Sequence, residues 1–177
     1  CNETRELNRY RSAVELNDAA CYGIVNNRND ILRSCMRHRI DFEQGCKVIP
    51  GTPVIPLDAA VWVRNIDAVR MLLAAGVDAT NPARFSMVYG MPCAAPNEEQ
   101  VCRELVGLFL QHGAPINAAY ARWNTEEAMT PVQRAVAVNR LAMLDILLEA
   151  GADANASGGP CNALDMAYIG GRREAIA

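Results

Sequence analysis

The sequence predicts an all-α fold built from repeated pairs of short helices, and three observations favour this class. Gly76, Gly113 and Gly151 recur at intervals of 37 and 38 residues, each directly after an apolar helical segment. Aromatic residues make up 6% of the 177 residues, so alanine and leucine must fill the core, as in closely packed helices. Hydrophobic residues at 51% and charged residues at 21% are typical of a globular chain rather than a disordered one.

Each recurring glycine is expected to end the second helix of a pair. Leu144, Leu147 and Leu148 have the i, i+3, i+4 spacing of a packed helix face, and Gly151 then supplies a left-handed C-cap. One period before the first glycine lies Arg39, whose side chain disfavours that conformation. The second helices are expected near 28–38, 67–75, 98–112 and 142–150. Since no pair can bury both of its faces alone, the pairs should stack as a solenoid.

Capping residues indicate where two of the helices begin. Thr130 followed by Pro131 supplies an N-cap side chain and a proline suited to the first helical position. Asn97 and Gln100 have the spacing of a capping box, so a second helix should begin near Glu98. The helix that begins at Pro131 is the first helix of its pair, and the helix that begins near Glu98 is the second helix of another pair.

These residues resemble the ankyrin repeat, whose pattern is T-P-L-H-x-A-A, a second helix and then G-A-D-x-N. The segment TPVQRAVAVNRLAMLDILLEAGADAN at 130–155 matches this pattern closely, and 56–80 matches nearly as well, with Asp58 in place of the histidine. Residues 84–117 match only in the second helix, and 16–43 match weakly. The resemblance therefore extends over most of the chain.

The resemblance implies an all-α ankyrin-repeat solenoid with about four repeats plus a truncated fifth that begins at Ala163. It covers residues 16–177, preceded at 1–15 by an N-terminal tether and the start of the first helix. The spacing in this chain exceeds the family period of about 33 residues, which implies extended finger loops. These insertions fall at 44–55, 91–97 and 115–129.

Catalytic and cofactor signals are weak. The only histidines, His38 and His112, share one repeat position at the end of a second helix, where imidazole can bond the last carbonyl groups. Nucleophile-elbow, zinc-protease and phosphate-loop motifs are absent from the sequence. A net charge of −3 offers no basic field for nucleic acid, and no apolar run approaches the roughly 18 residues of a membrane span. The sequence therefore predicts no enzyme, no cofactor, no metal site and no small-molecule substrate.

Seven cysteines are many for a chain in a reducing compartment. Cys1 stands where the lipid-attached cysteine of a bacterial lipoprotein would stand after removal of its signal peptide, although the alternative is that the sequence simply starts there. Without Cys1 six cysteines remain, an even number that suits an oxidising compartment. This interpretation places the protein in the periplasm or anchored to the outer membrane, with cytoplasmic and secreted locations as alternatives.

Two disulfides are expected, each between neighbouring segments. Cys93 lies in a loop just before the helix that carries Cys102, which allows a local bridge. Cys21 and Cys35 should lie roughly opposite one another on the antiparallel helices of the first pair. Cys46 belongs to the first repeat and Cys161 to the fifth. Several helix layers separate these repeats in a solenoid, so the two cysteines should be too far apart to pair with each other.

Aromatic and arginine side chains, the types enriched at binding hot spots, mark a candidate partner-binding surface. By the ankyrin resemblance, Trp62 and Val63 occupy first-helix positions that touch partners. Tyr120, Arg122 and Trp123 cluster in the long finger. Packing roles are the alternatives, with Trp62 half-buried between neighbouring first helices and Trp123 folded back onto its own repeat.

The resemblance implies a protein-binding module whose partner is another protein and whose contact with a membrane is limited to a lipid anchor at Cys1. An inhibitor or immunity-type protein that occludes a toxic hydrolase in the bacterial envelope needs no catalytic residue. A general envelope scaffold or stress-response accessory, and a secreted effector that binds host proteins, are the alternatives. The neighbouring gene and the residues upstream of Cys1 would discriminate among these roles.

Overall fold

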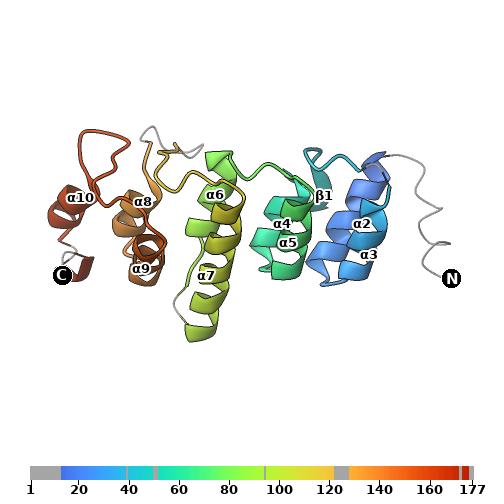
Figure 1. Cartoon of the computed structure of the whole chain (residues 1–177), viewed down its shortest axis with the longest axis horizontal. Coiled ribbons are helices and arrows are strands. Elements are labelled where there is room, and N and C mark those ends of the chain that lie inside the picture. The colour runs from blue at the N-terminus through green and yellow to red at the C-terminus, as the bar shows by residue number, and fades with distance from the viewer. Residues whose placement is uncertain are drawn as a thin grey trace. The chain divides into compact units, whose positions relative to one another are not determined.

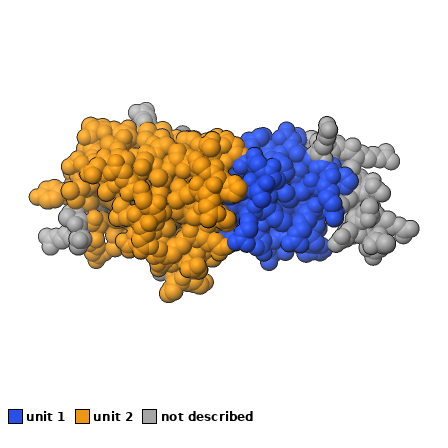
Figure 2. Space-filling view, viewed as in Figure 1, with its two compact units in different colours: residues 1–77 blue, residues 78–177 orange. Residues whose placement is uncertain are grey.

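The computed structural model describes residues 13–38, 40–49, 52–93, 95–121, 128–171 and 173–175. The chain divides into two compact units, residues 1–77 and residues 78–177 (Figure 2). Within the described residues the structure is mostly helical, with one two-stranded sheet and one isolated bridge, which confirms the all-α class. None of the helices in these ranges is long and apolar enough to cross a membrane.

The first unit contains two helix pairs, in which each helix packs against the next one along the chain. They are α2 (Ala13–Val25) with α3 (Asn29–Met36), and α4 (Pro56–Trp62) with α5 (Ile66–Ala74). The first helices of the two pairs, α2 and α4, also pack against each other (Figure 1). Leu32, Leu57 and Leu72 are fully buried and belong to the core of this unit.

A hairpin occupies the first predicted finger. Strand β1 (Cys46–Ile49) pairs antiparallel with β2 (Thr52–Val54), and Cys46 lies opposite Val54. β1 also contacts α2 (Figure 1). The connection between the two helix pairs is therefore attached to the first pair rather than extending freely from it.

The second unit contains, among its described residues, two further helix pairs and one more first helix. Its elements are α6 (Pro82–Tyr89), α7 (Pro96–Gln111), α8 (Pro131–Ala137), α9 (Leu141–Glu149), α10 (Ala163–Ile169) and the short 3-10 helix η1 (Arg173–Ala175). α6 packs against α7 and α8 against α9, while α7 contacts α9 and α10 packs against α8 (Figure 1). Phe85 and Phe109 are buried in this unit with their ring centroids 6.1 Å apart.

The second helices lie where the repeat spacing predicts them. α3, α5, α7 and α9 all begin and end within two residues of the expected limits. Gly76, Gly113 and Gly151 have φ angles of 89°, 84° and 90°, the left-handed conformation of a C-cap. The amide after each glycine donates to the carbonyl five residues earlier, at 2.9–3.2 Å, which closes the helix end. Arg39 lies outside the described residues.

A second left-handed position recurs between the helices of a pair, in addition to the predicted one. Asn27, Arg64, Asn139 and Gly171 have φ angles of 56°, 57°, 54° and 65°, and each lies two residues after the end of a first helix. Asparagine and glycine adopt this conformation at little cost, whereas arginine adopts it with strain. The described part of the α6–α7 link has no such residue.

Helix α8 begins as the sequence predicts. The hydroxyl oxygen of Thr130 accepts from the amide of Gln133 at 3.2 Å, and Gln133 Oε1 accepts from the amide of Thr130 at 2.8 Å. Pro131 occupies the first helical position. This reciprocal capping box satisfies two backbone amides that a helix N-terminus otherwise leaves without an intrahelical partner.

Helix α7 begins two residues earlier than predicted. Pro96 is already helical, because its ring holds φ in the helical range and the first position needs no amide donor. Asn97 therefore lies inside the first turn, and the capping box expected from it and Gln100 is wrong. Glu98 instead accepts a hydrogen bond from the amide of Ala95 at 3.4 Å.

Candidate partner-binding surfaces

An exposed apolar surface lies at the end of α4. Trp62, the last residue of that helix, is 65% exposed, and Val63 next to it is 38% exposed. Val25 ends α2 and is 39% exposed. The two helix ends are held together, because Asn65 Nδ2 donates to the carbonyl oxygen of Ile24 at 3.1 Å. We call Val25, Trp62 and Val63 the Trp62 surface, and its exposure places the indole on the outside of the unit.

The support of the Trp62 surface is an amide pair formed by buried Asn65 and half-buried Asn29. Asn65 and Asn29 exchange two side-chain hydrogen bonds of 2.9 and 3.1 Å. Asn65 Oδ1 also accepts from the amide of Ala68 at 3.1 Å, which caps α5. Asn65 is only 8% exposed, so these bonds replace the water that its amide loses. The amide pair thus fixes the end of α4 against both helices of the preceding pair.

The long finger of the second unit is closed at its base. Tyr120 and Met129 exchange backbone hydrogen bonds, with the amide of Tyr120 donating at 3.0 Å and the amide of Met129 at 3.3 Å. Tyr120 is half-buried at this bridge. Arg122 and Trp123, the other two finger residues predicted to bind a partner, lie outside the described residues. Their predicted role stays a prediction.

The described residues contain two disulfides, one in each unit. Cys93 and Cys102 are joined with their Cα atoms 6.3 Å apart, which confirms the predicted local bridge at the start of α7. Cys21 of α2 is joined to Cys46 of β1, with their Cα atoms 6.4 Å apart. Both Cα separations lie in the usual range for a bridge. Two bridges in one chain favour an oxidising, non-cytoplasmic compartment.

The predicted pairing of Cys21 with Cys35 is wrong, and the orientation of α2 explains why. Asn17 lies four residues before Cys21 on the same helical face, and its Nδ2 donates to the carbonyl oxygen of Gln44 at 3.2 Å. That face therefore meets the segment that leads into β1, where Cys46 lies. Cys35 remains a buried thiol on α3, and burial raises its pKa.

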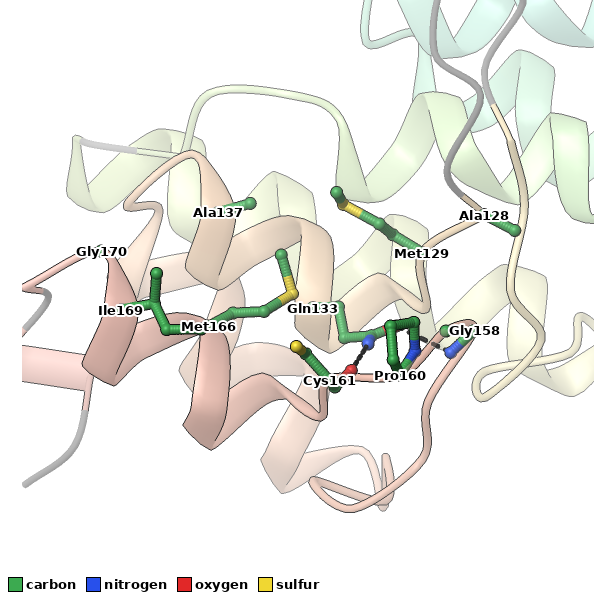
Figure 3. Close-up of a pocket in the computed structure, with 11 residues that line it drawn as sticks. Ala128, Met129, Gln133, Ala137, Gly158, Pro160, Cys161, Met166, Ile169 and Gly170 are labelled. Carbon is green, nitrogen blue, oxygen red and sulfur yellow. Dashed lines mark hydrogen bonds between the residues drawn. The ribbon is translucent and has the colours of Figure 1, made fainter.

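An apolar groove lies in the second unit between α8 and α10, with a volume of about 720 Å³ (Figure 3). Its walls come from Met129 at the base of the finger, from α8, from the loop at 158–161, and from Met166 and Ile169 of α10. No charged residue is among the described residues that line it. A groove of this size and polarity accommodates a small ligand or a few side chains.

Gln133 holds the walls of the groove in place. Its Nε2 donates to the carbonyl oxygen of Cys161 at 2.6 Å, while its Oε1 accepts from the amide of Gly158 at 3.1 Å as well as from Thr130. Gly158 approaches the finger so closely that a Cβ there would collide with the carbonyl of Ala128. Helix α8, the loop and the base of the finger are therefore locked to one another.

The two histidines lie at helix ends, as their shared repeat position indicates. His112 follows α7 directly, His38 lies two residues after α3, and both are exposed. The predicted contact between each imidazole and the last carbonyl groups stays a prediction. Neither histidine lies among the residues that line the groove.

Sequence reasoning missed the groove because its walls come from segments that are far apart in the chain. Met129, Gln133, Cys161 and Met166 share no motif spacing. No family model matches the chain, and no curated protein matches it significantly. A function is therefore argued from the Trp62 surface, the disulfides and the groove themselves.

Proposed function

We propose that this chain is a protein-binding module of the ankyrin-repeat type that acts by covering part of another protein. The observation that carries this proposal is the Trp62 surface, where an indole 65% exposed precedes the exposed Val63 and the end of the neighbouring helix α2 carries the exposed Val25. Tryptophan is enriched at binding hot spots, and an anchor on a hydrogen-bonded support loses little freedom on binding. The recurring helix pairs with left-handed glycine caps support the ankyrin assignment.

The two disulfides support a place in the bacterial envelope. In this proposal the protein is periplasmic, or attached to the outer membrane through a lipid on Cys1, a residue outside the described ranges. A lipid on Cys1 is the only membrane contact that the proposal requires. Cytoplasmic and secreted locations are the competing possibilities.

Within the envelope, we favour an inhibitor or immunity-type role against a toxic hydrolase. Such a role requires a rigid complementary surface and no catalytic group, so we propose no enzymatic activity for this chain. An envelope scaffold or stress-response accessory, and a secreted effector that binds host proteins, would use the same surface with other partners. The identity of the partner separates these roles, since a fold alone does not define function.

The test uses the product of the neighbouring gene as the candidate partner, and the immunity role expects that product to be a hydrolase. Binding and inhibition are measured by calorimetry and by hydrolase activity for the wild-type chain and for Trp62→Ala. We expect Trp62→Ala to weaken binding by roughly 2 kcal/mol or more, about thirtyfold, because a buried anchor would be lost from the interface. Its thermal midpoint should stay near that of the wild type, because the indole is exposed.

Leu148→Ala is the matched control, since Leu148, which the spacing predicts to pack with Leu144 and Leu147, is instead 41% exposed on a second helix and lies outside the Trp62 surface. It should bind like the wild type. A lowered thermal midpoint with unchanged affinity for Trp62→Ala would make Trp62 a packing residue and would overturn the proposal. A neighbouring gene that encodes an envelope component instead of a hydrolase, and whose product binds, would favour the scaffold role.

A further inference from the structure

Three sulfur atoms line the groove between α8 and α10. They are the thioethers of Met129 and Met166 and the thiol of Cys161. Figure 3 shows these side chains reaching into the same space from the finger, from α10 and from the loop. Cys161 is half-buried and takes part in neither disulfide. We propose that the groove binds a soft monovalent metal ion, Cu(I), through these three sulfur atoms.

The chemistry of these three sulfur ligands indicates which metal ion the groove would bind. Thiolate and thioether sulfur are the protein ligands that favour Cu(I), whereas Ca²⁺ and Mg²⁺ require oxygen ligands. Zn²⁺ is bound by cysteine, histidine and carboxylate side chains, and thioethers are not among its usual ligands. Among the described residues that line the groove, none is a histidine, an aspartate or a glutamate. A soft cation is therefore the only common metal class that matches these donors.

Charge balance favours the same ion. When the metal binds, the Cys161 thiol releases its proton to water as the sulfur–metal bond forms, and no electron is transferred. The resulting thiolate carries one negative charge and Cu(I) one positive charge, so the site is neutral. A neutral site suits walls without charged side chains, because a buried net charge is costly. A divalent ion would leave one positive charge uncompensated there.

The sulfur atoms are carried by backbone that the structure fixes independently of any metal. Met129 belongs to the bridge with Tyr120, and Met166 lies within α10. The carbonyl of Cys161 accepts from Gln133 Nε2 at 2.6 Å and from the Ser157 hydroxyl at 2.8 Å. Backbone held in this way lowers the cost of bringing ligands together, a requirement for a selective metal site.

The experiment measures Cu(I) binding to the full-length chain with its disulfides intact. Cys1 is replaced by serine in every protein, so that its thiol does not contribute. Cu(I), kept reduced under nitrogen, is titrated in competition with the chromogenic chelator bicinchoninate. We expect one equivalent to bind, Cys161→Ser to abolish this binding, and Met129→Leu and Met166→Leu each to weaken it about tenfold or more.

Two controls separate the site from general thiol chemistry. Met87→Leu removes a half-buried thioether of α6, and Cys35→Ser removes the other unpaired thiol of the described residues. Both should bind Cu(I) like the parent protein. Full affinity in Met129→Leu and Met166→Leu would show a thiol acting alone and would overturn the proposal. Loss of binding in Cys35→Ser would overturn it as well.

A second measurement does not depend on the folding of any variant. Methionine methyl groups labelled with carbon-13 are followed by NMR while Ag(I), a redox-inert analogue of Cu(I), is added to the parent protein. The signals of Met129 and Met166 should shift together at one equivalent, while those of Met87 and the buried Met143 stay in place. Unshifted Met129 and Met166 signals would refute the site. The outcome leaves the partner-binding proposal untouched, because that proposal uses the Trp62 surface.

Discussion

At the scale of single residues, Gly151 and Gly107 show how backbone conformation affects stability when packing is the same. A Cβ would meet nothing within 4 Å at either position, but Gly151 has a φ of 90° and Gly107 lies inside α7. We expect Gly151→Ala to lower the free energy of unfolding by about 1 kcal/mol, because a side chain strains the left-handed conformation. Gly107→Ala should raise it by about 0.5–1 kcal/mol, because alanine favours the helix. Urea unfolding measures both, and a loss in both variants would contradict this assignment.

Asp30 supplies a residue-scale prediction about pH. The hydrogen-bonded side chain of Arg28, with bonds of 2.9 and 2.7 Å, holds the pKa of Asp30 at about 2 instead of 3.8. A lowered folded-state pKa means that the pair stabilises the folded protein above pH 3.8 and loses this contribution as the pH falls towards 2. An NMR titration should give the low pKa for the wild type and a value nearer 3.8 for Arg28→Ala. Equal values in the two proteins would show that Arg28 does not act on Asp30 in solution.

At the scale of elements, Asn65 joins two helix pairs. Its amide bonds to Asn29, to the end of α2 and to the first turn of α5 while almost fully buried. We expect Asn65→Ala to destabilise the protein by about 1–3 kcal/mol, because it leaves the Asn29 amide and the carbonyl of Ile24 without this partner. Chemical denaturation provides the measurement. Asn97→Ala, an exposed change in the first turn of α7, should cost much less, and equal costs would mean that the buried hydrogen bonds of Asn65 contribute little to stability.

Elements differ in how far the sequence alone predicts them. The second helices could be predicted because a 3.6-residue apolar period and a left-handed glycine are local signals. The partner of Cys21 could not, because it depends on which way one face of α2 turns, and a contact of Asn17 with the hairpin segment decides that. The groove escaped prediction for a similar reason, since Met129 reaches it only through the bridge that closes the finger. Non-local packing, rather than propensity, determines both features.

At the scale of the whole molecule, the number of free thiols can be predicted and measured. Four of the six cysteines in the described residues are bridged, so Cys35 and Cys161 remain as thiols, and Cys1, outside those residues, is a third candidate. We expect thiol counting on the unfolded, unreduced protein to find three thiols, or two if Cys1 carries a lipid. Mass spectrometry of the unreduced peptides should find Cys21 and Cys46 joined by a disulfide. A count of seven would place the protein in a reducing compartment and would remove the main support for the envelope location.

The bridge between Cys21 and Cys46 skips the cysteine that lies between them in the chain. An oxidase that acts on the polypeptide from the N-terminus would meet Cys21 and Cys35, the first two cysteines of the described residues, before Cys46, and it would join these two first. Reaching the native bond then requires the Cys46 thiolate to attack Cys21 and release Cys35 as a thiol. Cys93 and Cys102 are consecutive and need no such exchange. If the protein matures in an oxidising compartment, we therefore expect the first unit, and not the second, to need a disulfide isomerase for efficient maturation.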